Sequence, residues 1–311
     1  YLIITISFLD TFIQLPIITP YAMELGASNI LAGGIVAIYS LTNMIGNIIG
    51  GHWIDRFGRK KMLLAGMVMV TVILLLYPLA QSGEQLFLVR LIHGLAGGVL
   101  IPAAFAYVGD QTTKKTRGKA MALTGACIGF AAIFGPAIGG IMAAKSEIAY
   151  VFYLVAILFS VTILLVLKFI KESFKASERS GVSLSHFLPL LKNKSLLQAS
   201  LAAFALMVSN GTLSFALPIK VEGMGATSST TGMLLSTFGI VALIVFLTPL
   251  NRMYDKFSPI KLVVIGLSII ASVHILLNFT VSPMMSYGLM MIYGVGFALV
   301  FPSMNRIVSE A

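Results

Sequence analysis

The stretch GHWIDRFGRKK occupies residues 51–61 of this chain. It is a short, highly charged turn between two long apolar runs, at about residues 30–50 and 62–80. A charge density this high beside such neighbours is typical of a loop just outside a lipid bilayer. The stretch therefore predicts a membrane protein in which a turn joins two membrane-spanning helices.

The composition points the same way. Of the 311 residues, 58% are hydrophobic and 10% are charged, and the mean hydropathy is +0.98. A soluble domain carries about 25% charged residues. A net charge of +10 would indicate nucleic-acid binding in a soluble protein, but here the basic residues cluster beside apolar runs, which encodes orientation instead. We expect no nucleic-acid partner. The single cysteine, Cys127, excludes an internal disulfide, and we expect no metal site and no cofactor.

Ten segments are each long enough to cross a bilayer as a helix. Helices are expected because the runs are continuously apolar and do not alternate as barrel strands do. The chain begins at Tyr1 with no basic leader, so no signal peptide can be read and the N-terminus looks trimmed. The expected spans are residues 1–22, 30–51, 62–80, 85–108, 120–144, 148–167, 195–219, 229–250, 262–282 and 284–305.

The basic residues predict the orientation of these spans. If the 51–61 loop is cytoplasmic, all but three of the 21 lysines and arginines lie on the cytoplasmic side. The exceptions are Lys145 and Lys220 in opposite loops and Arg90 within a span. This asymmetry predicts a multi-pass protein of the cell membrane with both termini in the cytoplasm.

One long connection divides the chain. We expect an N-terminal six-helix bundle at residues 1–167, a cytoplasmic linker at 168–194, and a C-terminal bundle at 195–311 with four helices. Within the linker, residues 183–191 are expected to form a short amphipathic helix on the membrane surface. A solvated linker and a regulatory or lipid-binding segment both fit its polar, basic composition.

The two bundles repeat each other in sequence. At an offset of 200, Asp55, Phe57 and Lys61 recur as residues of the same type, at 255, 257 and 261. One position earlier in register, Gly26 corresponds to Gly225. A repeat with the same orientation in both copies predicts a parallel duplication. Because six helices and four do not complete such a duplication, we expect the sequence to be a truncated record of a 12-helix protein.

Four segments resemble the major facilitator superfamily of secondary transporters. The spacing G-x-x-x-D-R-x-G-R-K-K at 51–61 resembles its signature loop between helices 2 and 3. Residues 90–94, Arg-Leu-Ile-His-Gly, resemble the helix 4 motif R-x-x-Q-G of proton-coupled members, with His93 in place of glutamine. Residues 135–140, Gly-Pro-Ala-Ile-Gly-Gly, resemble the helix 5 motif of drug:proton antiporters, and Arg117-Gly118 resembles the loop that opens that helix. The resemblance implies an all-α membrane fold of two pseudo-symmetric helix bundles, six helices plus four of an expected six.

The resemblance also implies a conformational latch on the cytoplasmic side. In the family, the aspartate at the position of Asp55 meets helix 11, and the basic residues of the loop link to an acid at the position of Asp110. Helix 11 is missing from this sequence, so that partner of Asp55 is missing too. A loop that only sets topology is the alternative. The expected latch residues are Gly51, Asp55, Arg56, Gly58, Arg59 and Asp110.

The helix 5 motif has a physical reading as well. Gly135 and Pro136 should kink or loosen the helix, and Gly139 and Gly140 offer a smooth surface for close packing. By resemblance, this face would meet helix 8 and seal the pathway between the two bundles. Simple packing glycines are the alternative.

Asp10 and Arg90 are the only Asp, Glu, Lys or Arg residues inside the expected spans. A charge at membrane depth is costly and indicates function. At 1.5 Å per residue, Asp10 lies about 21 Å and Arg90 about 9 Å below the outer boundary. This difference favours separate roles or a water-bridged link, although a direct ion pair stays open. Asp10 is the expected proton-binding group.

Several uncharged polar side chains inside the spans could line a central cavity. Asn210 stands 200 residues after Asp10, which makes it a candidate for substrate contact. Hydrogen bonds between helices are the alternative role for each residue. The candidates beside Asp10 and Arg90 are Asn43, His93 and Asn210, with Gln14 and Asn47 as further polar groups.

We therefore predict a proton-coupled secondary transporter that exports drugs or other small molecules by alternating access. Its expected partners are a small-molecule substrate, protons and the lipid bilayer, and we expect a monomer. A sugar or metabolite permease on the same fold is the first alternative. A membrane-embedded enzyme or receptor-like module is the second, but the sequence has no zinc-protease motif, no paired intramembrane carboxylates and no phosphate-binding loop.

Overall fold

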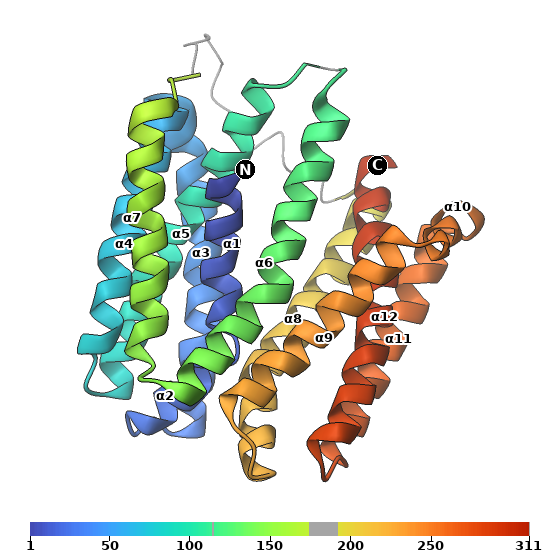
Figure 1. Ribbon diagram of the computed structural model, residues 1–311. Helices are drawn as coiled ribbons and strands as arrows, with labels where there is room; N and C mark the ends of the chain where they lie inside the picture. Colours follow the sequence, from blue (N-terminus) through green and yellow to red (C-terminus); the bar gives the residue numbers. More distant parts are fainter. Residues whose placement is uncertain (114, 174–191, 311) are drawn as a thin grey trace. The chain divides into compact units, whose positions relative to one another are not determined.

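The computed structural model describes residues 1–113, 115–173 and 192–310, which are almost entirely helical and contain no strand (Figure 1). Nine of the described helices are each long and apolar enough to span a membrane, and a bent pair makes a tenth. The all-α membrane architecture is thus confirmed. The helices are α1 (Leu2–Ile13), α2 (Ile18–Glu24), α3 (Asn29–Phe57), α4 (Arg59–Leu76), η1 (Tyr77–Leu79), α5 (Gly83–Asp110), α6 (Arg117–Lys145), α7 (Ala149–Phe169), α8 (Lys194–Gly223), α9 (Ser228–Leu247), η4 (Pro249–Arg252), α10 (Met253–Lys256), α11 (Pro259–Asn278) and α12 (Pro283–Glu310).

The chain forms two compact units. The first comprises Tyr1–Ala176 and Ser214–Gly232, and the second Ser177–Leu213 and Met233–Ala311. The predicted boundary at the 168–194 linker stays a prediction. The surface helix expected at residues 183–191 lies outside the described residues.

The first expected span is broken. A single helix over residues 1–22 was predicted, but α1 and α2 meet at an angle of 47°. Pro16 lies in the break, where it lacks an N–H donor and its ring disfavours a continuing helix. The Ser214 hydroxyl of the same unit donates to the Leu15 carbonyl at 3.5 Å, so the break is partly satisfied by a neighbouring helix.

The charged stretch at 51–61 is more helical than predicted. α3 continues to Phe57 and α4 begins at Arg59, so Gly58 alone separates the two helices. Gly58 has φ +99°, a conformation that only glycine adopts readily. A side chain here would also meet the Glu172 carboxylate, since a Cβ would lie 2.7 Å from its Oε2. Gly58 is therefore required both by the turn and by the space that Glu172 occupies.

Two prolines inside helices leave carbonyls that other helices satisfy. Pro218 has no N–H to offer the Ser214 carbonyl, and the Thr19 hydroxyl donates to that oxygen at 3.1 Å in the first unit. In the second unit, Pro302 leaves the Ala298 carbonyl free, and the Tyr254 hydroxyl donates to it at 2.7 Å. Such substitution allows proline within spanning helices.

Glycines allow α3 and α5 to pack closely in the first unit. A Cβ on Gly94 would collide with the Tyr39 carbonyl and the Thr42 hydroxyl. A Cβ on Gly98 would lie 2.7 Å from the Cα of Gly46. These contacts bring the two backbones together and so place the polar residues of α5 against α3 and α1.

The internal repeat is visible in two equivalent turns. Gly26, after α2, has φ +79°, and Gly225, after α8, has φ +76°. The amide of Ala27 donates to the Ala22 carbonyl, and the amide of Ala226 donates to the Val221 carbonyl. Both ends therefore form the same glycine-terminated cap, which agrees with the sequence correspondence.

Candidate functional site

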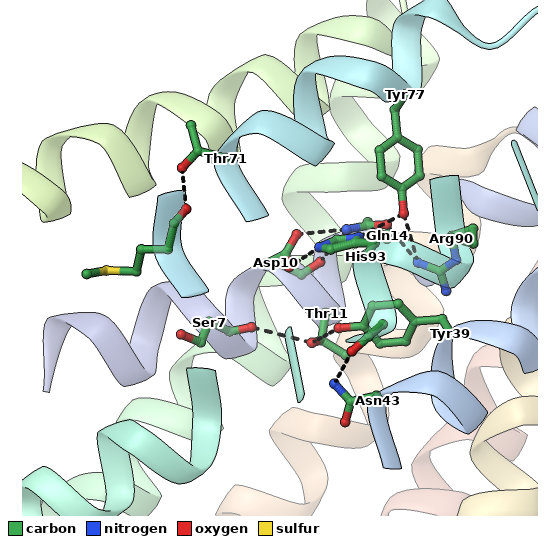
Figure 2. Close-up of polar contacts among 12 residues, drawn as sticks. Ser7, Asp10, Thr11, Gln14, Tyr39, Asn43, Thr71, Tyr77, Arg90 and His93 are labelled. Carbon is green, nitrogen blue, oxygen red and sulfur yellow. Dashed lines mark hydrogen bonds and ion pairs between the residues drawn. The ribbon is translucent and has the colours of Figure 1, made fainter. Parts of the chain in front are cut away.

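A buried polar network lies in the first unit, formed by residues from α1, η1, α3, α5 and the break after α1 (Figure 2). Each side chain is almost fully excluded from the surface. A polar cluster buried this completely must satisfy its hydrogen bonds internally. The residues of this Asp10 network are Asp10, Gln14, Tyr39, Tyr77, Arg90 and His93.

Asp10 has two side-chain hydrogen-bond partners in this network. Gln14 Nε2 lies 2.8 Å from Oδ1, and His93 Nε2 lies 3.0 Å from Oδ2. Asp10 itself is 3% exposed and His93 is fully buried. The other ring nitrogen of His93, Nδ1, lies 2.8 Å from the Tyr77 hydroxyl. The imidazole is thus held on both sides.

Arg90 completes the network from α5. Its NH1 donates to Gln14 Oε1 at 2.9 Å, and its Nε donates to the Ile35 carbonyl at 3.3 Å. The guanidinium carbon also lies 4.3 Å from the centre of the Tyr39 ring, which is a favourable position for a cation over an aromatic face. Arg90 is therefore paired with neutral dipoles and an aromatic face.

Gln14 connects the two charged groups. Within the described part of the chain no ion pair joins Asp10 to Arg90, and Gln14 bonds to both. The depths expected from the sequence differed for Asp10 and Arg90, because they assumed an unbroken helix over residues 1–22. In the structure, α1 ends at Ile13. Tyr77 and Tyr39 were missed, because the sequence does not indicate which faces of different helices meet.

Asn43 and Asn210 lie apart from these bonds. Asn43 Nδ2 donates to the Gly94 carbonyl at 3.4 Å and so joins α3 to α5. Asn210 belongs to the second unit, where its Oδ1 accepts from the Tyr293 hydroxyl at 3.2 Å. Both form hydrogen bonds between helices, the alternative role considered for them.

A second cluster lies where α3 and α5 end and α4 begins. Arg59 NH1 lies 3.2 Å from Asp55 Oδ1, and its Nε lies 2.9 Å from Asp110 Oδ2. NH1 also donates to the Ile54 carbonyl at 3.1 Å. The Arg59 side chain is 10% exposed, whereas Asp55 is 60% exposed. This Arg59 cluster therefore ties α3 and α5 to the start of α4.

Glu172, which follows α7, was not identified from the sequence. Its Oε1 accepts from the backbone amides of Arg59 at 2.9 Å and Lys60 at 3.3 Å. A carboxylate at a helix N-terminus binds free amides and interacts well with the helix dipole. The next residue, Ser173, donates to Asp110 Oδ2 at 3.0 Å. The segment after α7 is thus bound to the Arg59 cluster.

The other two expected latch residues lie outside these contacts. Arg56 is exposed, and its guanidinium carbon is 5.3 Å from the centre of the Phe57 ring. Gly51 is partly buried, and a Cβ there would have no heavy atom within 4 Å.

The glycines of the helix 5 motif, on α6, point in two directions. Cβ atoms on Gly135 and Gly139 would meet α1, the former 2.9 Å from Phe12 Cβ and the latter at the Ile13 carbonyl. A Cβ on Gly140 would meet the Ser228 carbonyl and would lie 3.0 Å from the Cα of Gly232, at the start of α9. Within the first unit, this motif therefore packs α6 closely against both neighbours.

Known proteins with similar sequences indicate the family of this chain. The family model described as Major Facilitator Superfamily matches residues 1–311. The chain belongs to the major facilitator superfamily. Among curated proteins it is 36% identical over 138 residues to Multidrug resistance protein 1 of Bacillus subtilis (strain 168), covering 44% of this chain and 36% of that protein. It is 28% identical over 307 residues to Multidrug resistance protein MdtG of Klebsiella pneumoniae (strain 342), covering 94% and 74%.

A third relative is Multidrug resistance protein 2 of Bacillus subtilis (strain 168), 31% identical over 182 residues. That match covers 58% of this chain and 45% of the relative, so the chain spans less than half the length of either Bacillus protein.

Two solved structures are similar in fold to this chain. A bacterial homologue of the human lysosomal transporter Spinster has a TM-score of 0.79 at 17% identity, covering 97% of this chain and 71% of that one. A D-xylose-proton symporter has a TM-score of 0.75 at 16% identity, covering 99% and 81%. At these identities the likeness concerns the fold alone.

Proposed function

We propose that this chain is a proton-coupled secondary transporter that exports small molecules by alternating access. The observation that carries the proposal is the Asp10 network, which keeps one carboxylate and one guanidinium almost fully buried inside a membrane-spanning unit. Burial of charged groups at this depth is expensive, and it is retained where function requires it.

Asp10 is the group that would carry the proton. It is the only acidic side chain in the network, and its carboxylate lies within hydrogen-bonding distance of Gln14 Nε2 and His93 Nε2. A rearrangement that removes either donor or dries the site would favour protonation. Alternating access would supply such a rearrangement because each state exposes the site to a different side.

Export of drugs is supported by the relatives, which are named multidrug resistance proteins. The basic residues beside the spans support an orientation with the termini and residues 51–61 in the cytoplasm of a cell-membrane protein. We propose a monomer that binds its substrate inside the bilayer and exchanges it for protons.

The Arg59 cluster would act as the cytoplasmic latch. Arg59 joins Asp55 to Asp110, and Glu172 binds the start of α4, so the cytoplasmic ends of α3, α4 and α5 would move as one body. Opening on this side would require the cluster to exchange its partners for water.

The test is proton flux in proteoliposomes loaded with a pH-sensitive dye, driven by an outward gradient of a fluorescent lipophilic cation. Asp10→Asn keeps the size of the side chain but cannot bind a proton, so flux should fall to that of empty vesicles. Glu147→Gln removes an exposed acid in a loop and should leave flux unchanged.

Size-exclusion profiles matching those of the unaltered protein would show that both variants are folded. Full coupled flux with Asp10→Asn contradicts the proposal. Protons moving in the same direction as the substrate would instead favour a symporting permease.

A further inference from the structure

The hydrogen bonds of the Asp10 network form a closed ring (Figure 2). Arg90 NH1 donates to Gln14, and Gln14 donates to Asp10. On the other side Arg90 NH1 lies 3.5 Å from the Tyr77 hydroxyl, Tyr77 lies against His93 Nδ1, and His93 Nε2 reaches Asp10. Two chains of polar contacts thus run from one guanidinium to one carboxylate.

Charge balance determines the protonation of the groups in this ring. Arg90 is permanently protonated, so a buried network with one positive charge requires one negative charge. Ionised Asp10 supplies that charge, and a neutral His93 then leaves the whole network neutral. An imidazolium would add an uncompensated positive charge in a fully buried place, close to Arg90.

The position of the proton on His93 follows. Ionised Asp10 can only accept, so His93 Nε2 must carry the hydrogen. Nδ1 of the neutral ring then has a lone pair, and the Tyr77 hydroxyl must donate to it. Arg90 NH1, which can only donate, faces the oxygen of that hydroxyl. Every contact in the ring is consistent with this single arrangement.

We propose that His93 and Tyr77 are positioning residues for Asp10: Tyr77 holds His93 as the neutral Nε2–H tautomer, so His93 stabilises ionised Asp10 without itself carrying the proton. The inference deepens the proposed function and rests on it. Proton exchange then takes place at Asp10, and the pH at which it occurs is set partly by a hydroxyl that does not touch Asp10.

The side chains packed around the His93 imidazole are mostly aromatic. The rings packed on His93 are Tyr39 of α3 and Tyr77 of η1, both edge-on, and Phe152 of α7 stacks on Tyr77. The Tyr39 hydroxyl is bonded to Thr11. Among the residues that the structure describes, the titratable or charged groups around the imidazole are Asp10, Tyr39, Tyr77 and Arg90.

The first test measures the tautomer directly, by nitrogen NMR of the full-length protein in bilayers with ¹⁵N-labelled histidine. The His93 signals are assigned by their loss in His93→Gln, and His274→Gln is the control because Nδ1 of His274 lies 2.9 Å from the Ile270 carbonyl of its own helix. A pyridine-type Nδ1 and a protonated Nε2 at neutral pH are expected. An imidazolium or the opposite tautomer overturns the proposal.

The second test measures the pH midpoint of proton flux in three variants. His93→Gln keeps a neutral N–H donor toward Asp10, so the midpoint should stay within about 0.3 pH units. Tyr77→Phe lets Nδ1 take the hydrogen, and His93→Leu removes the donor altogether. Both should shift the midpoint up by about one pH unit, because ionised Asp10 loses a hydrogen bond.

The outcomes separate the alternatives. A downward shift with Tyr77→Phe, or a loss of pH dependence with His93→Gln, means that the imidazole carries the proton and contradicts the proposal. No shift in Tyr77→Phe contradicts the role of Tyr77. If the unaltered protein shows no coupled flux, the proposed function fails by itself, and the NMR result still decides the tautomer.

Discussion

The two units place related residue pairs at equivalent positions, and the pairs differ in charge. Asp10 and His93 in the first unit correspond, at an offset of 200, to Asn210 and Tyr293 in the second. His93 Nε2 lies 3.0 Å from Asp10, and the Tyr293 hydroxyl lies 3.2 Å from Asn210. The duplication thus preserved a polar contact between the same two helices while replacing the groups that make it.

The packing around these pairs is also preserved. A Cβ on Gly94 would meet the Tyr39 carbonyl, and a Cβ on Gly294 would meet the Phe238 carbonyl, at the corresponding place. The network around the charge is not preserved, since Met290 stands where the first unit has Arg90. The helix contacts are therefore common to both units, whereas the buried charges of Asp10 and Arg90 have uncharged residues, Asn210 and Met290, at the equivalent positions.

The largest effect is expected from substitutions at the equivalent positions 10 and 210. Asp10→Asn copies the amide of the second unit into the first and should reduce proton-coupled flux to background. Asn210→Ala removes the equivalent group and should leave the pH midpoint of flux unchanged, because the second pair carries no titratable acid. Flux measured against pH in proteoliposomes checks both, and a shifted midpoint in Asn210→Ala would show that the units share the proton site.

The second largest effect is expected from Arg90→Met, which introduces the residue found at the equivalent position of the second unit, Met290. It leaves Asp10 buried without the positive charge to which Gln14 links it, and uncompensated buried charge costs up to about 3–5 kcal/mol. We expect lower thermal stability and flux with a midpoint at higher pH, because Asp10 would then bind a proton in order to stay neutral. The double variant Asp10→Asn with Arg90→Met should regain part of the lost stability, and thermal unfolding in detergent measures it.

The third prediction compares two arginines that donate to equivalent backbone carbonyls, one in each unit. Arg59 contacts two acids and the Ile54 carbonyl, whereas Arg306 NH1 donates to the Tyr254 carbonyl, 200 residues after Ile54. Arg59→Gln should increase, by about 5- to 10-fold, the labelling by thiol reagents of cysteines introduced on the proposed cytoplasmic side. A coupling free energy of about 1–3 kcal/mol is large enough for such a change. Arg306→Gln, at an exposed position, should change labelling less than about twofold. Equal effects would show that the latch is not particular to the first unit.

Sequence reasoning predicted the helices well and their contacts poorly. Continuous apolar runs and charged ends define spans locally, so the all-α fold, the repeat and the family could be predicted. Asp10, Arg90 and His93 were recognisable because charge inside an apolar run is conspicuous. Tyr39, Tyr77 and Glu172 were missed, because they take their roles from neighbours on other helices and one sequence does not specify which helix faces meet. The break at Pro16 was also missed, because proline is tolerated in many spanning helices.

The smallest effect concerns the carbonyls freed by the two prolines. Tyr254→Phe in the second unit and Thr19→Val in the first each leave one such carbonyl without its donor, at a cost of about 1 kcal/mol.

The two variants should differ in how their stability responds to pH. Burial raises the pKa of Tyr254 from 10.0 to about 12, so the folded protein retains the phenol proton more tightly than the unfolded chain. The stabilisation is complete below pH 10 and is lost as pH rises toward 12. The stability gap between unaltered protein and Tyr254→Phe should therefore narrow above pH 10, whereas the gap for Thr19→Val should stay constant, because a threonine hydroxyl does not titrate. Thermal unfolding measured from pH 8 upward tests this, and a Tyr254→Phe gap independent of pH would mean that the phenol does not support the Ala298 carbonyl.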